Sequence, residues 1–302
     1  MSIDRGTDPV TGAGEPVYLG ESRRACAEVA LVLEAVGLRP GLREVDGRWM
    51  VTVAPGDVHQ ARQEIRAWLA ENRTRPEPRP RAPLADGRPG VAGYVLVVVG
   101  VALASGNYAL GQDWLAAGRV DGAAMQAGQW WRAVTALTLH AGLDHLAANI
   151  AFGGVFGFFA GRYLGSGMAW LLVLLAGACG NVVNVWVMGF DHRAIGASTA
   201  VFAALGLLGS MTWSGRRQSA QGRLYRWGPI IGAVALLAYT GAGGERTDIG
   251  AHIWGFMAGL GAGLLAARLP REVLRRMRLQ VSAGAVALGV VLMAWVLALA
   301  GA

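Results

Sequence analysis

The chain contains 302 residues, of which 54% are hydrophobic, and its mean hydropathy is +0.39. This composition excludes an ordinary soluble protein of the same length and indicates a multi-pass membrane protein. The net charge of +7 comes largely from arginine, which in a membrane protein sets the topology, so we expect no nucleic-acid partner.

The residues that precede the apolar segments fall into three parts. Residues 1–15 are rich in Gly, Asp, Thr and Pro and are predicted to be disordered. Residues 16–73 predict a strand, a helix, two strands joined by a turn at Asp46-Gly47, and a second helix, which together form a small cytoplasmic α+β domain. Residues 74–90 form a Pro/Arg-rich linker, whose prolines favour an extended chain. The domain contains no catalytic constellation, so we expect it to bind a regulatory partner.

Seven apolar segments follow, and each predicts a transmembrane helix. They lie at residues 91–110, 145–164, 168–188, 197–213, 228–241, 249–267 and 280–300. The fifth is shorter than the ~20 residues that a span needs. The predicted fold is therefore an all-α polytopic bundle, with six helices in residues 91–268 and a cytoplasmic turn and seventh helix in residues 269–302.

Arginine residues predict the orientation of these helices. They gather in the linker and in the turns after the second, fourth and sixth spans, which all lie on one side of the membrane if the spans alternate. The positive-inside rule makes this side the cytoplasm, with the N-terminal domain inside and the C-terminus outside. We expect a protein of the bacterial cytoplasmic (inner) membrane.

Polar residues stand near the predicted outer start of three spans. His145 and Asn149 begin the second span, Ser198 the fourth and His252 the sixth. Ionisable residues inside a membrane are costly and usually functional, although these groups could also satisfy one another structurally. A serine beside a histidine suggests a nucleophile and its base, so we predict catalytic roles for Ser198 and His252. Asp248 is expected near the surface, so we predict that Ser198 and His252 act as a dyad without an acidic third member.

Two further groups are expected to complete this site. His145 and Asn149 are four residues apart and share a helix face, so both can donate hydrogen bonds to an oxyanion together with the Ser198 backbone N–H. Phe202 follows Ser198 by one turn and is expected to lie against the His252 ring. Packing would then orient the imidazole without a carboxylate.

Small residues on the same two spans are expected to bring them together. Gly206 lies two turns below Ser198, and Gly255 and Gly259 are spaced by four residues below His252. This spacing lets two helices approach closely. The Ser198 hydroxyl and the His252 ring would then meet within about 3 Å.

The segment between the first two spans is expected to lie in the membrane interface because it contains three tryptophans. Trp131 and Arg132 would fix it against the lipid headgroups. His140 is turned away from the face of His145, so we expect it to hold the loop or bind water rather than take part in chemistry.

Other polar residues are assigned no catalytic role. His192 is expected to be solvated in an outer loop, and Asn184 to make a hydrogen bond between helices. The glycine-rich residues 241–244 are either a flexible cap over the site or a plain connector. Neither Cys26 nor Cys179 has a metal-ligand neighbour, so we expect no disulfide, no metal and no cofactor.

Taken together, these residues resemble the rhomboid family of intramembrane serine proteases over about residues 91–268. The resemblance is carried by Trp131-Arg132 with Thr135, by His140, His145 and Asn149 in an H-x4-H-x3-N spacing, by Ser198 in a G-x-S motif, and by His252 with Gly255 and Gly259 in an A-H-x-x-G motif. Thr199 stands where the family pattern has a glycine.

The resemblance implies a serine endopeptidase that cleaves transmembrane segments of membrane-protein substrates near the outer face with a Ser198–His252 dyad. His145 and Asn149 would help to form its oxyanion hole, and its partners would be transmembrane proteins and the lipid bilayer. The alternative is a catalytically inactive relative that binds or escorts membrane clients. A transporter would need polar residues through the full membrane depth and an inverted repeat, and the sequence has neither.

Overall fold

The computed structural model describes residues 14–45, 47–72, 83–217, 222–241 and 247–301. Residues 1–13 of the predicted disordered N-terminus and most of the glycine-rich segment at residues 241–244 lie outside these ranges. The prediction was wrong for Glu15, which is described and begins a strand. The chain divides into two compact units, Met1–Arg75 and Pro76–Ala302, and each is described by itself.

The first unit is a three-stranded antiparallel sheet with two helices. Its elements are β1 (Glu15–Gly20), α1 (Arg23–Ala35), β2 (Gly41–Val45), β3 (Arg48–Val53), the 3-10 turn η1 (Pro55–Asp57) and α2 (Val58–Glu71). The strand order is β1-β3-β2. The Ser22 side chain accepts a hydrogen bond from the backbone of Ala25 and caps α1.

The core of this unit lies between the central strand and the two helices. Cys26 and Leu33 of α1 are fully buried against Val51 of β3, and Ile65 of α2 closes the same cluster. Hydrophobic side chains at helical spacing thus cover one face of the sheet, as the pattern in the sequence predicts. Cys26 packs as a small apolar side chain, and both cysteines of the chain are free thiols.

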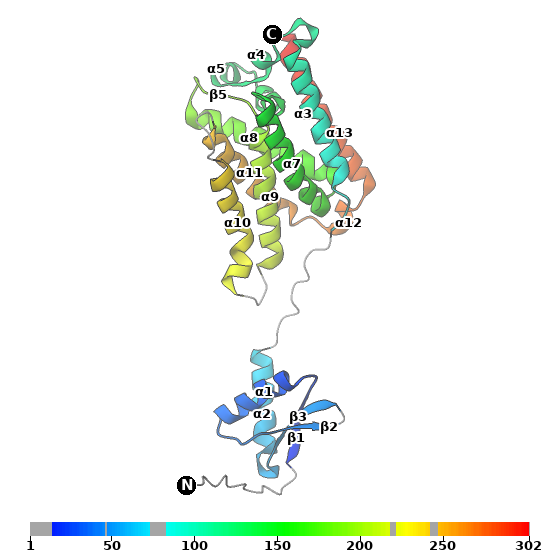
Figure 1. Cartoon of the computed structure of the whole chain (residues 1–302), viewed down its shortest axis with the longest axis vertical. Coiled ribbons are helices and arrows are strands. Elements are labelled where there is room, and N and C mark those ends of the chain that lie inside the picture. Colours follow the sequence, from blue (N-terminus) through cyan, green and yellow to red (C-terminus); the bar gives the residue numbers. More distant parts are fainter. Residues whose placement is uncertain (1–13, 46, 73–82, 218–221, 242–246, 302) are drawn as a thin grey trace, which may run out of the picture. The chain divides into compact units, whose positions relative to one another are not determined.

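The second unit is a bundle of long helices (Figure 1). Within the described residues these are α3 (Arg88–Gly106), α7 (Leu143–Leu164), α8 (Ser166–Met188), α9 (Ser198–Arg216), α10 (Arg223–Gly241), α11 (Ile249–Ala266) and α13 (Met277–Ala300). Five of them, namely α3, α7, α8, α11 and α13, are long and apolar enough to cross a membrane. The protein is therefore a helical membrane protein.

Two helix boundaries differ from the sequence-based expectation. Helix α3 begins at Arg88, inside the predicted linker, because Pro89 fits the first turn of a helix, where no backbone donor is needed. Helix α10 begins at Arg223 rather than at residue 228, and it continues through Pro229. It is therefore longer than the apolar segment alone predicts.

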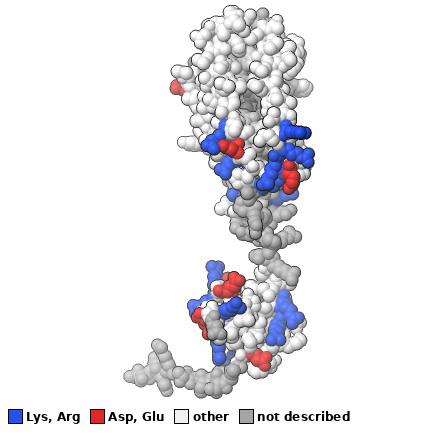
Figure 2. All heavy atoms as spheres, turned by 90° about the vertical axis from the view of Figure 1, so that its right-hand side faces the viewer, with Lys and Arg blue, Asp and Glu red and all other residues white. Residues whose placement is uncertain are grey.

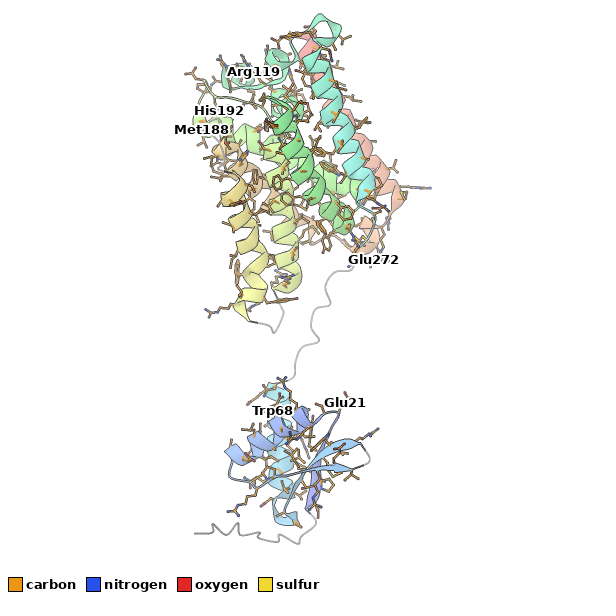
Figure 3. All side chains as sticks on the ribbon, viewed as in Figure 1. Glu21, Trp68, Arg119, Met188, His192 and Glu272 are labelled. Atoms are coloured by element: carbon orange, nitrogen blue, oxygen red, sulfur yellow. The ribbon has the colours of Figure 1, made fainter. Side chains whose placement is uncertain are left out.

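Short elements fill the segment between α3 and α7. They are η2 (Ala109–Gly111), α4 (Trp114–Gly118), β4 (Val120–Asp121), α5 (Gly122–Gln126), α6 (Arg132–Thr135) and η3 (Ala136–Thr138). Strand β4 pairs with β5 (Arg193–Ala194), which directly precedes the turn into α9. A last short helix, α12 (Arg271–Leu274), joins α11 to α13. Figure 3 shows Arg119 and His192 at one end of this unit and Glu272 at the other.

Helix α9 lies inside the bundle, in contact with α7, α8, α10 and α11. All side chains of residues 199–207 are buried. A Cβ atom on Gly259 of α11 would overlap the Ala203 carbonyl of α9, and one on Gly206 of α9 would overlap the Phe256 carbonyl of α11. The glycines therefore let the two backbones touch, as predicted.

Candidate active site

The site is centred on the first turns of α9 and α11. Ser198 is the first residue of α9, and His252 lies in the first turn of α11. The Ser198 Oγ and His252 Nε2 atoms are 2.8 Å apart, which is hydrogen-bond distance. The predicted contact between the Ser198 hydroxyl and the His252 ring is therefore present, and it results from the close packing of α9 on α11.

Phe202 lies beside the imidazole. The centroids of the Phe202 and His252 rings are 4.5 Å apart, with an angle of 41° between the planes. Both side chains are buried, with exposed fractions of 5% and 6%. Because the phenyl ring fills one side of the imidazole, it limits rotation of His252 away from Ser198.

Gly196 lies between Ser198 and His145. Its φ angle is +134°, and a Cβ atom there would lie 2.7 Å from Cε1 and 2.9 Å from Nε2 of His145, and 3.4 Å from Ser198 Oγ. A side chain at this position would therefore clash with the imidazole, and the glycine lets the His145 ring approach the turn that carries Ser198. The Gly196 N–H donates to the Ala136 carbonyl at 2.9 Å, which fixes the turn.

The hydrogen bonding of His145 determines what it can donate. The backbone N–H of Ala141 donates to His145 Nδ1 at 3.4 Å. When Nδ1 accepts a hydrogen bond, the proton of a neutral imidazole is on Nε2. The Nε2 atom next to Gly196 therefore carries the proton and can act as a donor close to the turn of Ser198.

Asn149 lies one helical turn after His145. Its buried side chain donates from Nδ2 to the His145 backbone carbonyl at 3.0 Å, within its own helix. The Asn149 backbone carbonyl accepts a hydrogen bond from the Tyr94 hydroxyl at 2.9 Å. Because the amide nitrogen carries two N–H groups, this bond leaves one donor, and the role of Asn149 toward an oxyanion stays a prediction.

His140 stands edge-on to His145, with 5.2 Å between the ring centroids. Both nitrogens of its ring are buried and make no hydrogen bond to the part of the chain that the structure describes. Burial lowers the pKa of His140 to about 4, and the neighbouring His145 adds to this effect, while the Thr138 backbone opposes it. His140 is therefore a neutral side chain near pH 7.

We expect this histidine to make the protein sensitive to acid. An unfolded histidine has a pKa near 6.5, so between pH ~6.5 and ~4 the unfolded state binds more protons and the free energy of unfolding falls as the pH falls. The contribution of His140 is of the order of 2 kcal/mol. Thermal unfolding at pH 7 and pH 4.5 should therefore show a smaller acid loss for His140→Phe than for the wild type. The same change at exposed His59 is the control, and an equal acid loss in all three proteins would contradict the prediction.

Arg132 organises the loop before the site. Its guanidinium donates to the carbonyls of Ala116 and Arg119 at 2.9 and 3.0 Å, and the Thr135 hydroxyl donates to the Gly118 carbonyl at 2.6 Å. A guanidinium supplies several donors at once, and here they bind backbone carbonyls of α4 and of the residue that precedes β4. The contact of Arg132 with lipid headgroups stays a prediction.

Helix α13 contacts the same loop. Trp295 of α13 donates from its indole nitrogen to the Thr138 hydroxyl at 3.0 Å and packs on Trp114 with 4.6 Å between the ring centroids. Trp131 joins this apolar cluster. Since Ala136 in the same stretch of chain accepts the hydrogen bond from Gly196, α13 supports the turn that carries Ser198.

A polar network that the sequence analysis missed holds the start of α11. Asp248 accepts hydrogen bonds from the Ala251 backbone at 3.0 Å and from the Asn184 amide at 2.9 Å, and it lies 2.8 Å from His192 Nε2. The expectation that His192 is solvated was wrong, since only 13% of its side chain is exposed. An aspartate at the helix cap, one turn before His252, was the available signal.

Thr199 fits the site because two neighbouring helices carry glycine. A Cβ atom on Gly180 of α8 or on Gly255 of α11 would lie 2.9 Å from the Thr199 methyl group. The methyl group thus occupies space that these glycines leave open, and Thr199 is buried without displacing Ser198.

These features define a class, namely helical membrane proteins with a serine-histidine pair at the ends of two closely packed helices. Residues 127–269 match the family model described as Rhomboid domain. This match and the curated relatives described next support a rhomboid family protein.

Several curated relatives are similar to part of the chain. Rhomboid protease GluP of Bacillus subtilis is 33% identical over 103 residues, covering 34% of this chain and 20% of the relative. Rhomboid-like protein 11, chloroplastic, of Arabidopsis thaliana is 34% identical over 90 residues, which cover 29% of this chain and 32% of the relative. RHOMBOID-like protein 7 of the same organism is 35% identical over 83 residues, which cover 28% of this chain and 25% of the relative. The chain therefore spans between a fifth and a third of the length of these relatives.

Proposed function

We propose that this protein is an intramembrane serine endopeptidase that cleaves transmembrane segments of membrane-protein substrates. The observation that carries the proposal is the 2.8 Å contact between Ser198 Oγ and His252 Nε2, because serine needs an adjacent base to act as a nucleophile. The relative GluP is named a rhomboid protease, which supports the same class of reaction.

The proposed reaction has two halves. The Ser198 hydroxyl gives its proton to His252 Nε2 while Oγ bonds to the carbonyl carbon of the substrate, and the C=O electrons move to oxygen. His252 then passes the proton to the leaving amine as the C–N bond breaks, which leaves an ester on Ser198. Water adds to this ester with His252 as base, and the acid product and the free hydroxyl are released.

The oxyanion of this reaction would lie near the Ser198 backbone N–H, at the N-terminus of α9, where the helix dipole favours negative charge. His145 Nε2–H would donate a second hydrogen bond to it. Asn149 would add a further hydrogen bond from the second N–H of its amide. We assign no chemical step to His140, Trp131 or Arg132, which hold the loop in place.

The arrangement also suggests where the substrate is cut. Ser198 and His252 lie within the first turn of their helices, so the scissile bond would lie near one end of a transmembrane segment. We propose that this end faces outward and that the N-terminal α+β unit lies in the cytoplasm, because the arginine-rich turns are at the opposite helix ends. The N-terminal unit would then bind a regulatory partner on the cytoplasmic side.

A fluorophosphonate probe in detergent-solubilised protein tests the dyad. We expect the probe to label the wild type at Ser198, because only a serine with an adjacent base attacks phosphorus readily. His252→Ala should reduce labelling by a factor of the order of 10² or more. Equal labelling of the wild type and His252→Ala would contradict a dyad, and absence of labelling in the folded wild type would favour an inactive relative that binds membrane clients.

A further inference from the structure

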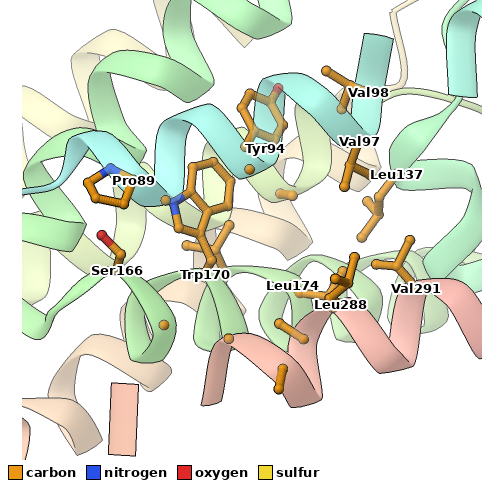
Figure 4. Close-up of a pocket in the computed structure, with 18 of the residues that line it drawn as sticks. Pro89, Tyr94, Val97, Val98, Leu137, Ser166, Trp170, Leu174, Leu288 and Val291 are labelled. Atoms are coloured by element: carbon orange, nitrogen blue, oxygen red, sulfur yellow. The ribbon is translucent and has the colours of Figure 1, made fainter. Parts of the chain in front are cut away.

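A cavity whose lining includes neither Ser198 nor His252 lies between α3 and α13, with α8 as its floor. It has a volume of about 370 Å³. In Figure 4, α3 and α13 run along opposite sides of it, and apolar side chains such as Leu174 and Leu288 face its interior. Toward one end Val97 of α3 and Val291 of α13 join one apolar cluster, which closes the cavity there.

The indole of Trp170 closes the opposite end of the cavity. Figure 4 shows its nitrogen on the edge of the ring that faces Pro89 and Ser166. A Cβ atom on Gly90 would overlap this edge, so the glycine lets the α3 backbone pack directly on it and the nitrogen is buried.

The polar side chains at this end are held by the protein itself. The Gln280 side chain accepts from the Met168 backbone at 3.1 Å and donates to the Leu164 carbonyl at 2.9 Å. The Tyr94 ring stacks on Trp170 with 4.6 Å between the centroids, which fixes the indole in place. The cavity is therefore an apolar chamber with a rigid aromatic wall at this end.

Positive charge surrounds the same end. Helices α3, α8 and α13 all begin there, and the N-terminus of a helix carries partial positive charge. Arg88 stands directly before Pro89 and pairs with Asp86 at 2.8 Å, and the exposed Arg276 and Arg278 stand at the start of α13. Figure 2 shows basic side chains gathered at one end of this unit, while the rest of the face has almost no charge.

We propose that this cavity binds an anionic glycerophospholipid. One acyl chain lies between α3 and α13, and the phosphate lies among the arginines at the start of α13. The apolar chain meets the apolar chamber, and the negative headgroup meets the positive charge at the helix starts. The cavity wall includes Ala197 and Ala200, so the bound chain also packs behind the turn that carries Ser198.

Lipid retention by the full chain tests the proposal. The protein is placed in nanodiscs of phosphatidylglycerol and phosphatidylcholine in equal amounts, extracted into detergent, and analysed by native mass spectrometry. Gly93 lines the cavity and a Cβ atom on it has no atom within 4 Å, so Gly93→Phe has room to fill the chamber. Gly100 has the same free surroundings on the same helix outside the cavity lining, so Gly100→Phe is the matched control.

We expect one phosphatidylglycerol to remain on the wild type and on Gly100→Phe, and about tenfold less on Gly93→Phe. No retained lipid on the wild type, or equal retention by all three proteins, would overturn the site. Equal retention of phosphatidylcholine would overturn the anionic headgroup. Labelling of Ser198 by the fluorophosphonate probe is measured separately. The lipid-retention result can therefore be interpreted even if the proposed protease function fails.

Discussion

Ser198→Ala should abolish cleavage of a single-span model substrate reconstituted with the protein in proteoliposomes. Under the proposed mechanism the Ser198 Oγ forms the covalent bond to the substrate, and this atom lies 2.8 Å from His252 Nε2. Removal of the nucleophile in serine proteases lowers the turnover rate by a factor of roughly 10⁴ to 10⁶. The measurement is the initial rate of product formation on a gel.

A serine lower on the same helix provides the control for this experiment. Ser210 is buried in α9, and its hydroxyl donates to the Leu207 carbonyl at 3.1 Å, far along the helix from His252. Ser210→Ala should keep the cleavage rate within about a factor of three, because it removes one intrahelical hydrogen bond. Unchanged cleavage by Ser198→Ala would remove the basis of the proposed enzyme.

Gly259→Ala should cause the second largest loss of cleavage activity, since it adds a methyl group between the two helices of the site. That group would overlap the Ala203 carbonyl of α9, so the backbones of α9 and α11 must separate. Overpacking of this kind costs about 1–3 kcal/mol of stability. The separation also lengthens the contact between Ser198 and His252, so activity should fall more than stability does.

Gly261→Ala, two residues further along α11, is the matched control. A Cβ atom at this position has no atom within 4 Å, and alanine favours a helix over glycine by about 1 kcal/mol. The control should therefore have the same or a higher unfolding temperature and unchanged cleavage. The two variants are compared by thermal unfolding in detergent and by the substrate assay, and similar behaviour of both would contradict the close-packing argument.

The sequence predicts the centre of this site well for a physical reason. Helix starts and glycine spacing are local features, and together they determine which side chains two packed helices bring to one depth. The contact of Ser198 with His252 and the position of Phe202 are both present. The catalytic roles of these residues stay a prediction.

The surroundings of the site could not be predicted to the same extent. The rotamer of Asn149 depends on which acceptor is nearest when no substrate is bound, and the partners of Arg132 are backbone carbonyls of a loop. His192 and Asp248 are separated by 55 intervening residues, and only the tertiary fold joins them. Such contacts arise from loop geometry, which hydrophobic periodicity does not describe.

The fit of Thr199 has a consequence for how related sequences can diverge. Its methyl group, Gly180 and Gly255 share one small volume that belongs to three helices at once. A Cβ atom on Gly180 would also lie 2.7 Å from the Gly255 backbone, and one on Gly255 would overlap the Thr199 carbonyl. Position 199 can therefore become smaller without a change on α8 or α11, whereas neither glycine can be replaced while the three helices keep this packing.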